Sequence, residues 1–268
     1  MIERIESTSN PKVKHLVRLR KSSRYRKEMG LFIVEGKREI EAMLSSGKFI
    51  EELYFSNELL DGISIAQFLP NLNEKITTFD LSQLAMNKIS YRNQAKDAVG
   101  LVKVWDLALP NSHNLGLELV LVLDEIEKPG NLGAILRTAD AMGVDAVVLS
   151  DSCVDFFNPN VVRSSMGLFA SMPVFSGTKE NVFHWLNESK LKVLGTSSKG
   201  TEFIHNFTFD KPAAIVMGSE SHGLGSFWAK NISGMISIPL YGRASSLNLN
   251  CATACVLMEF NRQTKCTD

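Results

Sequence analysis

The sequence has few cysteines, no long apolar run and no net charge, and each deficit argues against a class of protein. Its four cysteines form no C-x-x-C pair and have no companion histidine cluster, which argues against a zinc site. No uninterrupted apolar stretch reaches about 18 residues, and the opening MIERIESTSN lacks the apolar core of a signal peptide. We therefore expect a soluble, cytoplasmic protein without membrane or metal, whose cysteines serve as small buried hydrophobic residues.

The zero net charge hides an uneven distribution of charged residues along the chain. Residues 1–38 contain eleven Lys and Arg residues and four acidic residues, a surplus of +7, and the remainder of the chain carries −7. A basic amino-terminal region suits a polyanionic partner, but a solvated charged helix accounts for the same pattern. Charge alone leaves both interpretations open.

The alternation of apolar and polar segments predicts an α/β protein with two domains. Residues 1–105 begin with a basic helical segment over 1–29, in which a helix is expected to start near Pro11. Short strands and helices alternate in the rest of this domain. Residues 106–116 are rich in Pro, Asn, Ser and Gly and form the predicted linker. Residues 117–268 form the second domain, whose nearly continuous apolar first strand is typical of a parallel sheet covered on both faces. We expect later strands near 144–149, 193–196, 213–217 and 235–238, and helices near 133–142, 182–188 and 249–262.

Three glycine-containing stretches follow predicted strands of the second domain, where open α/β sheets bind ligands. The first, residues 124–133, leads into a predicted helix, with Asn131 at or just before the N-cap and Arg137 about one turn inside. Arg137 can project toward the crevice at the ends of the strands. Taken alone, this stretch also fits an ordinary loop with a capping asparagine and a surface arginine.

The second and third stretches lie at residues 217–225 and 238–250. The second has three glycines that permit close approach of a ligand, and Glu220 can fix the loop. In the third, Ser246 and Asn248 precede the last predicted helix and are expected to cap it. The sequence has neither a G-x-G-x-x-G turn after a first strand nor a P-loop, which disfavours a nicotinamide enzyme.

In this order, the three stretches resemble motifs 1, 2 and 3 of the SpoU/TrmH branch of SPOUT RNA methyltransferases. The matches are N-x-G-x-x-x-R-T-A over 131–139, G-x-E-x-x-G over 218–223 and I-P-x-x-G-x-x-x-S-L-N over 238–248. With Asn158-Pro159 and the segment 162–167, the resemblance covers about residues 117–262. The first domain is similar to the L30e-like substrate-binding domain of the same family.

The resemblance implies a SPOUT-type parallel sheet with a deep trefoil knot, a homodimer formed through the carboxy-terminal domain, and S-adenosylmethionine as cofactor. It also implies methylation of a ribose 2′-hydroxyl in RNA, with ribosomal RNA favoured over transfer RNA. A catalytically inactive RNA-binding protein on the same fold and a base-methylating SPOUT enzyme are the alternatives.

The same resemblance assigns roles to individual residues. The residues that it places against the cofactor are Met217, Gly218, Ile238, Leu240, Leu247 and Asn248. The residues that it assigns to methyl transfer are Asn131, Arg137, Glu220, Ser246 and Asn248. The basic residues expected to contact RNA are Arg18, Arg20, Lys21, Arg24, Lys37 and Arg163. Because arginine stays protonated in proteins, we expect Arg137 to stabilise charge on the attacking oxygen and not to act as the base. Asn250, at a position where small residues are common in this family, is the one departure from its pattern.

Overall fold

A computed structural model describes residues 2–73, 75–91, 97–112, 115–200, 202–265 of the chain. The chain divides into two compact units. Unit 1 contains Met1–Trp105 together with Asp155–Ser171, and unit 2 contains Asp106–Val154 together with Met172–Asp268. The short segment 155–171, which the sequence places in the second domain, therefore groups with unit 1.

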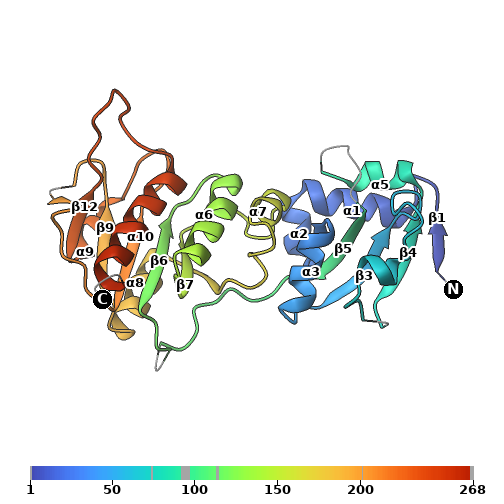
Figure 1. The fold of residues 1–268 in the computed structure, drawn as a ribbon, viewed down its shortest axis with the longest axis horizontal. Helices are drawn as coiled ribbons and strands as arrows, with labels where there is room; N and C mark the ends of the chain where they lie inside the picture. Colours follow the sequence, from blue (N-terminus) through green and yellow to red (C-terminus); the bar gives the residue numbers. More distant parts are fainter. Residues whose placement is uncertain (1, 74, 92–96, 113–114, 201, 266–268) are drawn as a thin grey trace. The chain divides into compact units, whose positions relative to one another are not determined.

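Unit 1 is built on a mixed five-stranded sheet in the order β1-β4-β3-β5-β2 (Figure 1). Strands β1, β4 and β3 are parallel, and β5 runs antiparallel to both β3 and β2. The strands are β1 (Glu3–Ile5), β2 (Leu31–Glu35), β3 (Ile50–Phe55), β4 (Thr77–Leu81) and β5 (Ala98–Lys103). The helices are α1 (Pro11–Lys21), α2 (Ser23–Met29), α3 (Lys37–Ser45), α4 (Ile65–Phe68), α5 (Gln83–Ile89) and α7 (Pro159–Ser164).

Residues 1–29 were predicted from the sequence as a basic helical segment. In the structure they form a strand and two helices. Helix α1 begins as predicted, because Asn10 caps it and Pro11 occupies its first turn. The chain breaks at Ser22, which ends α1 in an extended conformation and caps α2 by accepting a hydrogen bond from the Tyr25 amide at 3.1 Å. The apolar side of α1, with Val13, Leu16 and Leu19, is completely buried in the core of unit 1.

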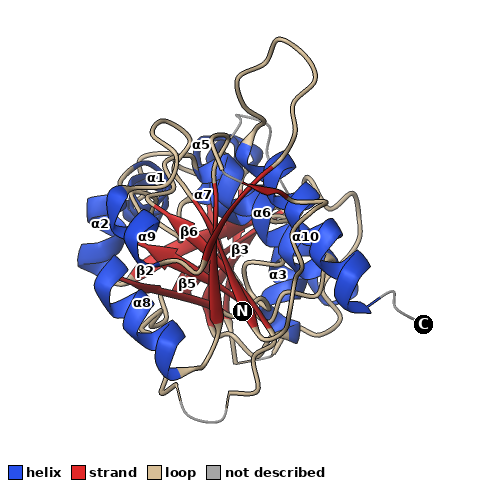
Figure 2. Cartoon of the chain, turned by 90° about the vertical axis from the view of Figure 1, so that its left-hand side faces the viewer, coloured by secondary structure: helices blue, strands red, loops and turns tan. Residues whose placement is uncertain are grey.

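Unit 2 is a seven-stranded parallel sheet in the order β10-β12-β9-β11-β6-β7-β8. The strands are β6 (Leu119–Asp124), β7 (Ala146–Ser150), β8 (Val174–Gly177), β9 (Lys192–Thr196), β10 (Glu202–Phe203), β11 (Ala213–Met217) and β12 (Gly234–Ser237). The helices are α6 (Pro129–Ala141), α8 (Lys179–Glu188), α9 (Ser226–Asn231) and α10 (Leu249–Lys265). Helices α8 and α9 cover one face of this sheet and α6 and α10 the other (Figure 2).

The central strands β6 and β11 are buried along their whole length, which confirms the apolar pattern used to predict them. Helix α6 begins four residues earlier than predicted, at Pro129. Lys128 is its N-cap and Asn131 lies within its first turn, so the expected N-cap position of Asn131 is wrong. The Asn131 side chain is thereby free to bond to other loops instead of to its own helix.

The cysteines depart from their predicted burial. Cys153, Cys251 and Cys255 are exposed, and the prediction that they are buried hydrophobic residues is wrong for these three. Cys251 and Cys255 share one face of α10, as their spacing predicts. In the single chain this face is exposed to solvent. Cys266 lies outside the described residues. No helix in the described ranges is both long and apolar enough to cross a membrane.

Candidate cofactor site

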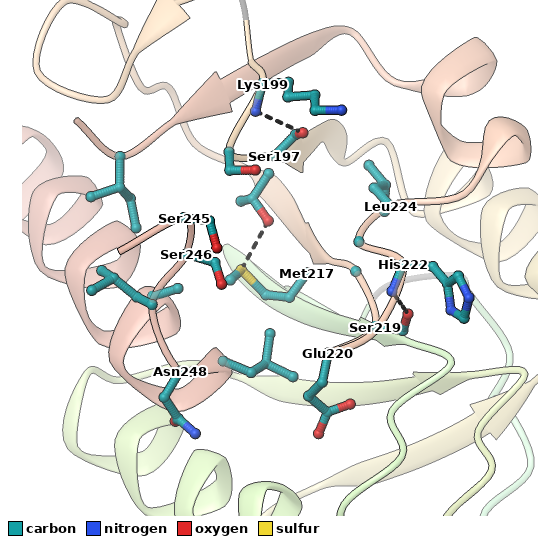
Figure 3. Close-up of a pocket in the computed structure, with 18 of the residues that line it drawn as sticks. Ser197, Lys199, Met217, Ser219, Glu220, His222, Leu224, Ser245, Ser246 and Asn248 are labelled. Atoms are coloured by element: carbon teal, nitrogen blue, oxygen red, sulfur yellow. Dashed lines mark hydrogen bonds between the residues drawn. The ribbon is translucent and has the colours of Figure 1, made fainter. Parts of the chain in front are cut away.

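A cavity of about 700 Å³ lies in unit 2 at the carboxyl ends of the parallel strands. Four neighbouring strands, β12, β9, β11 and β6, end at this edge, and the loops that follow the first three of them line the cavity (Figure 3). The walls consist of Thr196–Lys199 from the end of β9, Met217–Leu224 from the end of β11, Ile236, Ile238 and Leu240 from β12 onward, Ser245–Leu249 at the start of α10, Ala252 and Val256 of α10, and Lys128 after β6. The volume is in the range of small-molecule sites.

All six residues assigned to the cofactor by resemblance line this cavity. The six are Met217, Gly218, Ile238, Leu240, Leu247 and Asn248. Of the five assigned to methyl transfer, Glu220, Ser246 and Asn248 line it, and Asn131 and Arg137 do not. The wall formed by residues 196–199 was not predicted from the sequence. The sequence of this wall, Ser-Ser-Lys-Gly directly after a strand, consists of small and polar residues that are common in loops without any ligand.

The turn after β11 depends on glycine at one position. A side chain at Gly218 would place its Cβ 2.2 Å from the carbonyl carbon of Gly223 and 2.3 Å from the Leu224 amide nitrogen. The turn is closed by two backbone hydrogen bonds between Ser219 and Gly223, each 3.0 Å long, and Gly223 has a φ of 69°. Glycine at 218 is therefore required for the turn to close on itself, and the closed turn lines one wall of the cavity.

Glu220 connects the second motif to the first. Its carboxylate accepts hydrogen bonds from the amides of Glu127 and Lys128, at 3.0 and 3.3 Å, and from the Asn131 side-chain nitrogen at 2.8 Å. A charged acceptor is suited to bind several N–H groups at once. Glu220 therefore fixes the loop before α6 against the turn after β11.

Asn131 and Asn248 connect the first motif to the third. The Asn248 side-chain nitrogen donates to the Asn131 oxygen at 3.2 Å, and the Asn248 oxygen accepts from the Asn250 amide at 2.9 Å. The second bond lies at the start of α10, as the predicted capping role of Asn248 requires. Thr138 adds a further contact by donating to the Asn250 side-chain oxygen at 2.8 Å. The three motifs thus meet in one polar network, and Asn250 takes part in it.

Arg137 and Ser246 occupy different positions from this network. Arg137 is exposed on α6 and is not among the residues that line the cavity. Ser246 is exposed in the loop before α10 and lines the cavity, and we found no bond from it to the helix among the described residues. The Arg137 side chain is therefore accessible to solvent outside the cavity lining.

Asp124 ends β6 directly before the first motif and is almost fully buried. Burial raises the pKa of its carboxyl group, and the Ser150 hydroxyl donates a hydrogen bond to it at 2.7 Å. Because Asp124 does not line the cavity, we interpret it as a support that holds the ends of β6 and β7 together.

The basic residues of unit 1 fall into two groups. Arg18, Lys21, Arg24 and Lys37 are exposed, as contact with RNA requires. Of these, Lys37 also pairs with Glu41 at 3.8 Å. Other basic residues are held in ion pairs, among them Arg4 with Glu6, Glu58 and Asp80, Lys12 with Glu52, and Arg26 with Asp155. Part of the positive surplus that the sequence shows is therefore structural and faces carboxylates of the protein itself.

Comparison with known families identifies the chain. The profile of the SpoU rRNA Methylase family matches residues 118–258, and that of the MRM3-like substrate binding domain matches residues 10–100. The chain belongs to the SpoU rRNA methylase family. The family match includes all three motifs, and so the network of Glu220, Asn131 and Asn248 lies within the methylase domain.

Curated relatives of this SpoU protein cover nearly its whole length. The 23S rRNA (guanosine(2553)-2′-O)-methyltransferase RlmP of Bacillus subtilis is 28% identical over 253 residues, 94% of this chain and 97% of the relative. The 23S rRNA (uridine(2479)-2′-O)-methyltransferase of Streptomyces viridochromogenes is 27% identical over 252 residues, 89% of this chain and 85% of the relative.

Solved structures show the same two-part organisation. The AdoMet-bound rRNA methyltransferase of Sinorhizobium meliloti has a TM-score of 0.83 at 28% identity, with 98% of each chain covered. The SpoU methyltransferase AviRb of Streptomyces viridochromogenes, in complex with AdoMet, has a TM-score of 0.85 at 25% identity, with 95% of this chain and 98% of that chain covered.

Proposed function

We propose that this SpoU protein is an S-adenosylmethionine-dependent RNA methyltransferase that modifies a ribose 2′-hydroxyl of 23S ribosomal RNA. The network that joins the three motifs beside one cavity carries the proposal. The relatives named as 23S rRNA 2′-O-methyltransferases and the neighbours solved with AdoMet support it. An inactive RNA-binding protein does not need Asn131, Glu220 and Asn248 held together beside a cavity.

The cavity fits the proposed cofactor in its chemistry. Apolar side chains of Met217, Ile238, Leu240 and Leu247 suit an adenosyl group, and the backbone turn at Gly218 lines the same cavity. When bound, S-adenosylmethionine supplies an activated methyl group. Asn131 then positions the ribose hydroxyl, and the Arg137 guanidinium stabilises the negative charge that develops on its oxygen. Glu220 holds Asn131 in place by accepting its side-chain hydrogen bond.

Nucleoside analysis of the product tests the proposed reaction. The protein is incubated with ribosomal RNA from cells that lack it and with methyl-labelled S-adenosylmethionine, and the RNA is digested and analysed by mass spectrometry. We expect the label in a 2′-O-methylnucleoside. Label in a base would instead identify a base-methylating enzyme, and cofactor binding without any transfer would identify an inactive RNA-binding protein.

Replacing Glu220 by glutamine should lower kcat/KM for methyl transfer about 10- to 100-fold. Glutamine keeps one acceptor oxygen but turns an NH₂ group toward N–H donors of Glu127, Lys128 and Asn131. Hydrogen bonds to charged groups each contribute about 1.5–3 kcal/mol. Initial rates of label transfer measure the effect, and Glu180→Gln, an exposed acidic residue on α8, is the control. An unchanged rate in Glu220→Gln contradicts the positioning role.

The exposed basic residues of α1 and α2 should contribute salt-dependent affinity for RNA. We expect the triple replacement of Arg18, Lys21 and Arg24 by glutamine to weaken binding and to reduce the slope of log K against log salt by up to about 2. Arg20 is kept, because its guanidinium donates to the carbonyls of Ile89 and Ser90 at the end of α5. Fluorescence titration at several salt concentrations measures the slope.

The matched control for this slope replaces three exposed lysines elsewhere, namely Lys75, Lys190 and Lys230, by glutamine. It removes the same charge from the chain as the triple variant. If both variants reduce the slope equally, only net charge acts on RNA, and α1 and α2 do not form a specific contact surface.

We further propose that the protein is a cytoplasmic homodimer through unit 2. Helix α10 presents Cys251, Cys255 and Met258 at spacings of four and three residues, and all three are exposed. A second copy of the same face would cover this apolar stripe. Sedimentation over a range of protein concentrations measures the oligomeric state.

The trefoil knot also stays a proposal, supported by one close approach in unit 2 between segments that are remote in sequence. A Cβ at Gly200 would lie 2.8 Å from the Ile236 backbone. A chain threaded through a loop needs such positions, because side chains would separate the crossing segments.

A further inference from the structure

Tyr91, which is exposed, and Arg163, which is half-buried, form a cation–π pair in unit 1. Tyr91 follows α5, Arg163 lies on α7, and the guanidinium carbon of Arg163 is 5.5 Å from the centroid of the Tyr91 ring. One Arg163 nitrogen also donates to the Asn160 side-chain oxygen at 3.0 Å, which fixes the plane of the guanidinium. Arg163 was expected to contact RNA from the sequence, whereas Tyr91 was not singled out.

Hydrogen bonds hold the two segments that carry Tyr91 and Arg163 in place. The Tyr91 amide donates to a Glu35 carboxylate oxygen at 2.9 Å, and Arg20 donates to the carbonyls of the two residues before Tyr91. On the other side, Asp155, in the segment that leads to α7, is bound by the buried guanidinium of Arg26 at 2.6 Å. The geometry of the two partners is therefore fixed before any ligand binds.

The surface around the pair combines an aromatic ring, a cation and an apolar side chain. Tyr91 is 41% exposed, and Met166, one turn beyond Arg163, is 40% exposed. Met166 has a φ of 54° and Gly167 a φ of 96°. A Cβ at Gly167 would lie 2.9 Å from the Ala42 Cβ, so this turn is seated directly on α3. Packing within the chain thus holds Met166 in an unusual backbone conformation that leaves it exposed.

This combination suits an unpaired nucleobase. A phosphate is bound by cations and by N–H or O–H donors and gains nothing from an aromatic face, whereas a base binds by stacking on an aromatic ring or on the plane of an arginine. We propose that Tyr91 and Arg163 form a stacking site for an unpaired base of the RNA substrate. The inference rests on the proposed function, because it assigns a site on unit 1 that binds the RNA substrate of the methyltransferase.

A fluorescent base analogue tests the site in the full-length protein. The probe is a mixed-sequence single-stranded RNA that contains one 2-aminopurine, whose fluorescence falls when the base stacks on an aromatic ring. We expect Tyr91→Ala to weaken binding about 10-fold and to reduce the quenching. The salt slope should stay unchanged because the ring carries no charge. Tyr91→Phe keeps the ring and should bind within twofold of the wild type.

A second variant and a control keep the test independent of folding. Arg163→Met removes the guanidinium without touching the ring, and it should also weaken binding and reduce the quenching. Phe49→Ala removes a ring of unit 1 that is 66% exposed, and it should bind as the wild type does. Thermal unfolding of every variant identifies any loss that comes from misfolding.

The outcomes separate this site from the proposed function. If the wild type binds the RNA and methylates ribosomal RNA, but Tyr91→Ala and Arg163→Met bind and quench as the wild type does, the stacking site is wrong and the function stands. If the wild type binds neither RNA nor S-adenosylmethionine, the proposed function fails, and the stacking site fails with it.

Discussion

Replacing Arg137 by alanine should lower kcat for methyl transfer about 10²- to 10³-fold and leave the Kd for S-adenosylmethionine within a few-fold. The first effect is the usual result of removing one donor that stabilises a developing oxyanion. The second follows from the position of Arg137, which is exposed on α6 and does not line the cavity. Single-turnover rates and isothermal titration of the cofactor measure the two quantities separately.

Two further variants make the Arg137 test specific. Arg137→Lys keeps the charge but loses the planar fork of donors, so we expect an intermediate rate. Lys230→Ala, which removes an exposed cation on α9, should leave both quantities unchanged. If Arg137→Ala loses cofactor affinity as strongly as it loses rate, the arginine belongs to the cofactor site and our assignment is wrong.

Replacing Asp155 by alanine should lower the free energy of unfolding of unit 1 by about 3–5 kcal/mol. Arg26 is only 2% exposed, and its Nε and Nη2 atoms both donate to one Asp155 oxygen, at 2.8 and 2.6 Å. The Ser23 hydroxyl donates to the same oxygen at 2.9 Å. Removing the carboxylate leaves a buried guanidinium without its counter-charge. Urea unfolding followed by tryptophan fluorescence measures the loss, because Trp105 packs in the same unit.

The control for Asp155 is an ion pair on the surface of the same unit. Lys103 and Glu51 lie 2.9 Å apart, but the Lys103 side chain is 65% exposed, so Lys103→Met should change the free energy of unfolding by under about 1 kcal/mol. The double variant Arg26→Met with Asp155→Leu should recover part of the lost stability, because no charge is then left buried. Equal losses in the single and double variants would contradict the ion-pair explanation.

The sequence allowed much of unit 2 to be predicted. Strands β6 and β11 lie at the centre of a parallel sheet and are buried on both faces, so their unbroken apolar runs were visible without any structure. The loops after parallel strands share one edge of the sheet, which explains why separated motifs could be expected to converge. The bonds among Asn131, Glu220 and Asn248 are consistent with that expectation.

Other features were hidden because their signal is not local. The edge strands β1 and β10 have three and two residues, too short for a periodic pattern. The prediction that Cys251 and Cys255 are buried used residue type alone, whereas the rotation of α10 on the sheet sets which of its faces is exposed. Likewise, Arg26 looked like one more basic residue of a charged helix until Asp155 was seen beside it.

The sequence by itself determined the two-domain α/β organisation, the central strands, and the family motifs that name the residues around the cavity. Only the tertiary structure decided which basic residues face solvent and which are neutralised within the protein. It also decided that Asn131 bonds to Glu220 and Asn248, and that the Arg163 guanidinium lies over the Tyr91 ring. The reason is physical: hydrophobic periodicity records burial along one segment, whereas an ion pair or a stacked ring depends on a partner that is remote in sequence.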